Sequence, residues 1–136
     1  MPMSSIDFRP VARNFYQSYN DKDLDSSFDR FIATDLINHT MGGSLDREKW
    51  LNFDKAFLTA CPDLKMVVKE QFAEDNRVVT YWDCHGTHTA DFLGMPASGN
   101  PIRLTGISID DIRNGKIAEH FALADFTQFM QQFGKK

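Results

Sequence analysis

An Asn-Gly pair near the end of the chain places the strongest constraint on its fold. Asn114 and Gly115 separate two segments in which apolar and polar residues alternate, residues 102–113 and 116–124. Both central positions of a two-residue hairpin turn need a positive φ, which Asn and Gly adopt more easily than other residues. The sequence therefore predicts an antiparallel hairpin here. After the hairpin, four apolar residues at helical spacing predict a short closing helix: Phe126, Phe129, Met130 and Phe133.

The first half of the chain predicts helices instead. Apolar residues recur at helical spacing in three segments, which are residues 8–20, 24–32 and 47–61. Asp23 and Asp46 stand where the second and third helices need an N-cap, and Pro62 ends the third helix. Strands are expected at residues 64–73 and 77–90, before the hairpin. This order predicts one α+β domain over residues 1–136, with three helices, a long antiparallel meander and a closing helix.

The two-residue turn also predicts which hairpin side chains share a face. Counting outward from the turn pairs Ile109 with His120 and places Ala122 on the same face. The side chains of that face are mostly small and apolar, so we expect it to form the wall of a pocket. The opposite face carries Ser108, Phe121 and Leu123, and we expect it to be the outer surface, through which two copies pack as a homodimer.

Composition excludes several classes of partner. A net charge of −4 and a pI near 5.5 argue against nucleic acid and against an anionic membrane surface. No apolar stretch approaches the roughly 18 residues of a membrane span, and the N-terminus lacks the apolar core of a signal peptide. Cys61 and Cys84 could form one disulfide bridge, but two buried reduced thiols are expected. The expected location is the cytoplasm.

A series of short motifs in fixed order resembles the SnoaL-like polyketide cyclase family, often labelled ester cyclases, which has the nuclear-transport-factor-2-like fold. The motifs are Gly86-Thr87-His88, Gly94-x-Pro96-x-Ser98-Gly99, Asn114-Gly115-Lys116-Ile117-x-Glu119-His120-Phe121, Asp125 and Gln131-Gln132-Phe133-Gly134. The resemblance covers about residues 8–134. It implies a cone-shaped barrel made of a curved sheet covered by the helices, with a deep apolar pocket, no metal, and often a homodimer.

The resemblance also implies the chemistry. In characterised cyclases of this family, an aspartate at the position of Asp125 acts as acid and base in an intramolecular aldol ring closure. Asp125 is therefore the expected catalytic residue, together with His120. The alternative is that Asp125 only caps the final helix, because Gln128 follows it at capping-box spacing. The expected substrate-binding residues are Asn38, His39, Trp50, Trp82, His88, Ile109 and Ala122, although His88 and the two tryptophans also fit a purely structural role.

A metal site is not expected. His85 and His88 have an odd spacing on a predicted strand, so their rings lie on opposite faces, and Cys84 is roughly 13 Å from His88 along that strand. The expected function is that of a cofactor-independent cyclase or isomerase acting on a small, largely apolar carbonyl compound. Two alternatives stay open: a non-catalytic ligand-binding or assembly module, and a hydrolase in which Asp125 activates water.

Overall fold

The computed structural model describes residues 6–40 and 43–134, and it confirms the α+β class. Its helices are α1 (Arg9–Gln17), the 3₁₀ helix η1 (Ser18–Asp21), α2 (Leu24–Phe31), α3 (Arg47–Ala60) and α4 (Phe126–Gly134). Its strands are β1 (Ile32–Thr40), β2 (Gly43–Asp46), β3 (Lys65–Glu74), β4 (Arg77–Thr87), β5 (Pro101–Arg113) and β6 (Lys116–Ala124). No helix within these residues has the length and apolar character that crossing a membrane requires.

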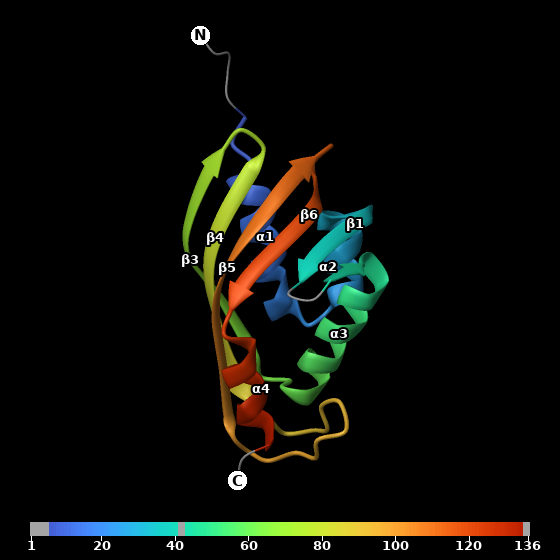
Figure 1. Cartoon of the computed structure of the whole chain (residues 1–136), viewed down its shortest axis with the longest axis vertical. Helices are drawn as coiled ribbons and strands as arrows, with labels where there is room; N and C mark the ends of the chain where they lie inside the picture. The colour runs from blue at the N-terminus through green and yellow to red at the C-terminus, as the bar shows by residue number, and fades with distance from the viewer. Residues whose placement is uncertain (1–5, 41–42, 135–136) are drawn as a thin grey trace.

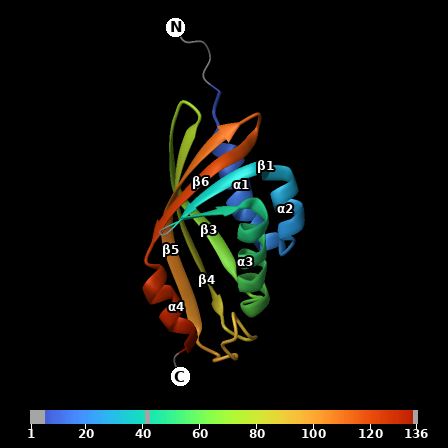
Figure 2. The same ribbon diagram turned by 45° about the vertical axis from the view of Figure 1, so that its right-hand side comes forward.

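The six strands form one curved sheet in the order β2-β1-β6-β5-β4-β3 (Figure 1). Three features differ from the sequence prediction. Strands β1 and β2 were not among the predicted strands. The sheet is mixed, because β1 runs parallel to β6, and it is open, because its edge strands β2 and β3 do not pair with each other. Parallel strands are joined by a long stretch of chain, as β1 and β6 are here. The periodicity within each strand does not reveal that two strands so far apart in the sequence pair with each other. Figure 2 shows α2 and α3 on the same side of the open sheet.

The N-terminal helices begin where the sequence predicts. The side chain of Asp23 accepts a hydrogen bond from the Ser26 N–H at the start of α2, and Asp46 does the same for the Lys49 N–H at the start of α3. The apolar faces of these helices meet in an aromatic cluster. Within it the ring centre of Phe15 lies 5.5 Å from that of Phe28 and 5.6 Å from that of Trp50. This cluster holds the helices against the inner face of the sheet.

The hairpin between β5 and β6 is confirmed, but its predicted register is wrong. Asn114 and Gly115 have φ values of 53° and 79°, as the turn requires. Pairing starts as expected, yet the register shifts after Ile112, so that Asp111 lies opposite Glu119. Ala118 is the extra residue of a β-bulge, which turn chemistry alone does not predict.

The bulge decides which side chains face inward. It places His120 opposite Asp110 and Phe121 opposite Ile109. Asp110, Ser108 and His120 are therefore buried beneath the helices, whereas Ile109 lies on the outer face and is 37% exposed. The expectation that Ile109 lines the pocket is wrong for this reason, as is the expectation that Ser108 faces outward.

Candidate functional site

A cavity lies between the helices and the inner face of the sheet, in two adjoining chambers. The inner chamber has a volume of about 100 Å³, and aromatic and apolar side chains make up most of its wall. The outer chamber has a volume of about 280 Å³. The same five side chains border both chambers, and we call this set the neck: Trp50, Phe53, Asp54, His120 and Phe126.

Asp110 and His120 form a buried dyad behind the neck. The Oδ1 atom of Asp110 lies 2.6 Å from His120 Nδ1, and its Oδ2 atom accepts a 2.6 Å hydrogen bond from the Tyr16 hydroxyl. The bulge at Ala118 creates this pairing, because without it His120 would lie opposite Ile109. Asp110 is fully buried, and both of its carboxylate oxygens have partners.

The His120 ring is held on two sides. Its Nδ1 edge contacts Asp110, and its face stacks on the Trp50 indole, with ring centres 4.4 Å apart and planes 22° from parallel. Because Nδ1 is engaged, Nε2 is the ring nitrogen left for a molecule in the cavity. Burial raises the pKa of Tyr16 well above its ordinary value, and the neighbouring Asp110 carboxylate adds to this effect. Tyr16 therefore stays a neutral donor behind the ring.

Asp54 is a second acidic group at the neck. It lies one turn after Trp50 on α3, and its Oδ2 accepts hydrogen bonds from the Tyr19 hydroxyl at 2.5 Å and from Trp50 Nε1 at 3.0 Å. Burial raises the pKa of Asp54 from its ordinary value to about 6, although these two hydrogen bonds and the nearby His120 act in the opposite direction. Its carboxyl can therefore give or take a proton near neutral pH.

Trp82 forms part of the inner chamber wall and has a fixed orientation. Its Nε1 donates a 2.7 Å hydrogen bond to Ser108 Oγ on β5. Its six-membered ring lies over Gly106, where an added Cβ would be only 2.6 Å from the ring. A glycine at position 106 therefore lets the indole lie flat against the sheet.

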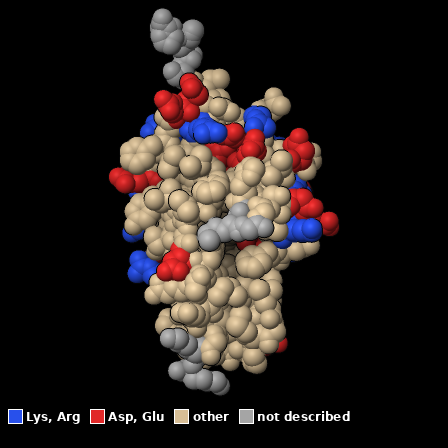
Figure 3. Space-filling view, in the orientation of Figure 1, with Lys and Arg blue, Asp and Glu red and all other residues tan. Residues whose placement is uncertain are grey.

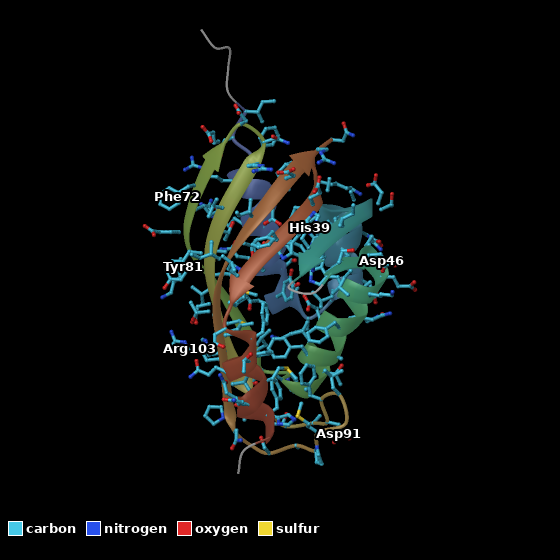
Figure 4. All side chains as sticks on the ribbon, viewed as in Figure 1. His39, Asp46, Phe72, Tyr81, Asp91 and Arg103 are labelled. Atoms are coloured by element: carbon cyan, nitrogen blue, oxygen red, sulfur yellow. The ribbon has the colours of Figure 1, made fainter. Side chains whose placement is uncertain are left out.

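Most of the predicted binding residues border the cavity. Trp50, Trp82 and His120 contribute to the inner chamber, and Asn38, His39 and Ala122 contribute to the outer one. His39 is exposed on β1 next to β6 (Figure 4), and its Nε2 lies 2.9 Å from Glu119 Oε1.

His88 occupies a different place. It is fully buried outside both chambers, with Nδ1 2.9 Å from Ser98 Oγ and its ring edge against Phe133. This position does not support a substrate-binding role for His88 at the two chambers.

Asp125 lies outside the cavity as well. It is exposed at the junction of β6 and α4, and its Oδ1 accepts a 2.9 Å hydrogen bond from the Gln128 N–H. Neither chamber includes it in its wall. This geometry is that of a helix cap, and it does not support the assignment of Asp125 as the acid/base group.

Five polar residues of the site were missed by the sequence reasoning: Tyr16, Tyr19, Asp54, Ser108 and Asp110. Asp54 left a signal, because it is a carboxylate on the apolar face of α3 shared with Trp50 and Phe57. Tyr16 and Tyr19 have the same helical spacing as the apolar residues of the first predicted helix, so they were read as part of its apolar face. Within residues 6–40 and 43–134, no group of three or more His, Cys, Asp or Glu side chains is arranged to hold a metal ion.

Comparisons with known proteins identify a family and solved structures with the same fold. A sequence profile described as SnoaL-like polyketide cyclase matches residues 10–133. The structure is similar to that of IdmH, a candidate polyketide cyclase from Streptomyces antibioticus, with 26% identity, a TM-score of 0.78 and coverage of 96% of this chain and 100% of that one. Among proteins with curated descriptions, none matches this chain.

Two further structures share the fold at lower identity. AclR from Streptomyces galilaeus, a candidate hydroxylase, has 20% identity, a TM-score of 0.85 and coverage of 98% of this chain and 99% of its own. A candidate SnoaL-like polyketide cyclase from Jannaschia sp. CCS1 has 15% identity, a TM-score of 0.79 and 99% coverage of both chains.

Proposed function

Because this chain belongs to the SnoaL-like polyketide cyclase family, we propose that it is a cyclase or isomerase that moves protons within a small, largely apolar carbonyl compound. The reaction removes a proton from the carbon next to a carbonyl group, and the resulting enolate closes a ring or shifts a double bond. These steps are proton transfers and carbon–carbon bond formation, so they need no redox cofactor. The cyclase description of IdmH supports the same class.

The single observation that carries this proposal is the Asp110–His120 dyad. Asp110 holds Nδ1 of the ring, so Nε2 is the atom that takes the proton from the substrate carbon. The Asp110 carboxylate then stabilises the imidazolium that forms, as a buried carboxylate does for a catalytic histidine. Asp110 acts here as a positioning residue, because Tyr16 and His120 occupy both of its oxygens.

The cavity supports a substrate that is largely apolar. Its inner wall is mostly aromatic, and no Lys or Arg among the described residues borders either chamber. Binding pockets of this kind use a few polar groups to orient an otherwise apolar ligand. The polar groups here are concentrated at the neck, where a substrate spanning both chambers places its reacting atoms.

A general probe of proton abstraction tests this function without knowledge of the natural substrate. In 5-nitrobenzisoxazole, a base removes the proton on C3, the N–O bond breaks, and a coloured 2-cyano-4-nitrophenolate is released. We expect the wild-type protein to accelerate this reaction. His120→Gln keeps a polar side chain but loses the basic nitrogen, so kcat/KM falls by roughly 10²–10⁴-fold.

His85→Gln is the matched control, because His85 is exposed on the outer face of β4. It leaves the rate unchanged. Wild-type protein no faster than His120→Gln contradicts the proposal and favours a non-catalytic binding module of the same fold.

We also propose that the protein works in the cytoplasm. Cys61 and Cys84 are both buried as free thiols, and burial raises the pKa of Cys84 to about 12. Unpaired cysteines of this kind are typical of proteins from reducing compartments.

A further inference from the structure

We infer that Asp54 is the second proton-transfer group of this site, the acid that protonates the carbonyl oxygen of the substrate whose carbon is attacked after His120 has removed a proton from the neighbouring nucleophilic carbon. The inference rests on the proposed function and deepens it. It divides the acid and base roles between two groups on different elements, α3 and β6. Three observations carry it. Two concern the geometry of the neck, and the third concerns the groups that surround Asp54.

The first observation is the position of Asp54. Asp54 and His120 both border the inner and the outer chamber, so a substrate that spans the two chambers contacts both side chains. Trp50 contacts both of them: its indole N–H donates a hydrogen bond to Asp54, and its ring face stacks on His120. One rigid side chain therefore fixes the relative placement of the two groups.

The second observation is how Asp54 uses its two oxygens. Both hydrogen bonds, from Tyr19 and from Trp50, go to Oδ2. Oδ1 has no hydrogen-bond partner among the described residues. It is not among the unpartnered polar atoms that are fully buried, so part of its surface is accessible. When Asp54 is protonated, the hydrogen is therefore carried on Oδ1, the oxygen left for a molecule in the two chambers that Asp54 borders.

The third observation concerns the groups that surround Asp54. Tyr19, Tyr16, Cys84 and His120 face it from η1, α1, β4 and β6. Burial raises the pKa values of both tyrosines and of Cys84, so these three stay neutral near pH 7. Among these four groups, His120 is the one that the proposed function uses as the base. A pKa of about 6 keeps both forms of Asp54 available.

The atoms balance in a single ring closure. His120 Nε2 takes a proton from the carbon next to one carbonyl, and that carbon attacks a second carbonyl carbon. The new C–C bond forms, the C=O π electrons move to oxygen, and this oxygen takes the proton from Asp54 Oδ1. The site is left with His120 protonated and Asp54 ionised, and transfer of one proton between them, through product or water, restores it.

Two probes separate the two roles. The elimination of 5-nitrobenzisoxazole needs a base only. The retro-aldol cleavage of 4-hydroxy-4-(4-nitrophenyl)butan-2-one runs the proposed step backwards: Asp54 takes the hydroxyl proton, the C–C bond breaks, and the His120 imidazolium protonates the enolate carbon. It releases acetone and 4-nitrobenzaldehyde, and the aldehyde can be measured by its absorbance.

The variant Asp54→Asn keeps an acceptor for Tyr19 and Trp50 but cannot transfer the proton. We expect kcat/KM for the retro-aldol reaction to fall at least tenfold more than that for the elimination. Glu48→Gln is the matched control, because it removes an exposed carboxylate from the same helix, and it leaves both rates unchanged. His120→Gln lowers both rates by roughly 10² or more.

The pH dependence of the retro-aldol rate distinguishes a proton-transfer role of Asp54 from a purely structural one, because a structural role would not change the shape of the pH profile. The retro-aldol rate of the wild type increases with pH around pH 6, because Asp54 must be ionised to take the hydroxyl proton. Asp54→Asn lacks this ascending limb of the pH profile. The Tyr19 hydrogen bond lowers the pKa of Asp54, so Tyr19→Phe moves the limb to higher pH.

The roles of Asp54 and His120 are tested separately by these measurements. If the elimination depends on His120 but Asp54→Asn lowers both rates equally, or if the wild type shows no retro-aldol cleavage, the role of Asp54 is overturned and the role of His120 stands. If the elimination does not depend on His120, the proposed function itself fails.

Discussion

At the scale of single residues, Asp54 links pH to the stability of the fold. Its folded-state pKa of about 6 lies above the ordinary value of 3.8, so the folded protein holds this proton more tightly than the unfolded chain does. The stability that this proton contributes is complete below about pH 4. It is lost as the pH rises from about 4 through 6, because the unfolded chain then releases the proton first.

Asp54→Asn removes this pH dependence. Relative to the wild type, its free energy of unfolding rises by up to about 3 kcal/mol between pH 4 and pH 8, since each pKa unit corresponds to about 1.36 kcal/mol. Urea unfolding at several pH values measures the difference. Parallel stability curves for the two proteins would show that the Asp54 pKa is not raised in the folded state.

The residues missed from the sequence share a physical cause. A buried carboxylate is tolerated only when hydrogen-bond donors reach it, and here those donors come from distant segments. Asp54 depends on Tyr19, which is 35 residues away, and Asp110 depends on Tyr16, which is 94 residues away. Local periodicity assigns each residue to a face, but it cannot show which polar groups meet across the core.

At the scale of elements, local signals predicted the α-helices and four of the six strands, whereas β1 and β2 were not predicted. The Asn114-Gly115 turn and the aspartate caps of α2 and α3 depend on neighbours within a few residues, and the structure confirms them. The register of β6 was not predictable in the same way. A single extra residue at Ala118 shifts the pairing of every following β6 residue by one, so that His120 shares the inner face with Asp110 and not with Ile109.

Helix α4 provides a prediction at this scale. Its residues Phe126 and Phe129 border the cavity, and the Asp125 carboxylate caps its first turn. Asp125→Ala removes the cap and lowers the free energy of unfolding by about 1 kcal/mol, whereas Asp125→Asn changes it by only a few tenths. Thermal or urea unfolding measures both variants. A loss of 10²-fold or more in probe turnover by Asp125→Asn would return the acid/base role to this residue.

At the scale of the whole molecule, the outer face of the sheet carries an apolar surface. Its exposed apolar side chains lie at adjacent positions on the paired strands β3, β4, β5 and β6. They are Phe72, Tyr81, Ile107, Ile109, Phe121 and Leu123. Figure 4 shows Phe72 and Tyr81 at the β3–β4 edge, and Figure 3 shows charged side chains mostly at the upper end and margins of this face. We propose that two copies pack through this surface, because an exposed apolar patch rimmed by charge is typical of an interface.

The expected species in solution is therefore a homodimer, twice the 15.6 kDa chain. Phe121→Glu places a charge at the centre of the surface and shifts the equilibrium to monomer. Leu93→Glu, which changes an exposed leucine in the loop between β4 and β5, leaves the dimer intact. Light scattering at tens of micromolar measures all three proteins. A wild-type mass of 15.6 kDa would contradict the proposed dimer.

The claim on which the account depends most is that Nε2 of His120 is the basic atom facing the cavity. Nitrogen-15 NMR of the histidine rings measures this directly, with His120 assigned by its loss in His120→Gln. The account predicts that the neutral ring carries its hydrogen on Nδ1, donated to Asp110, and that Nε2 is unprotonated. A neutral ring with its hydrogen on Nε2 would contradict it, because no basic nitrogen would then face the substrate.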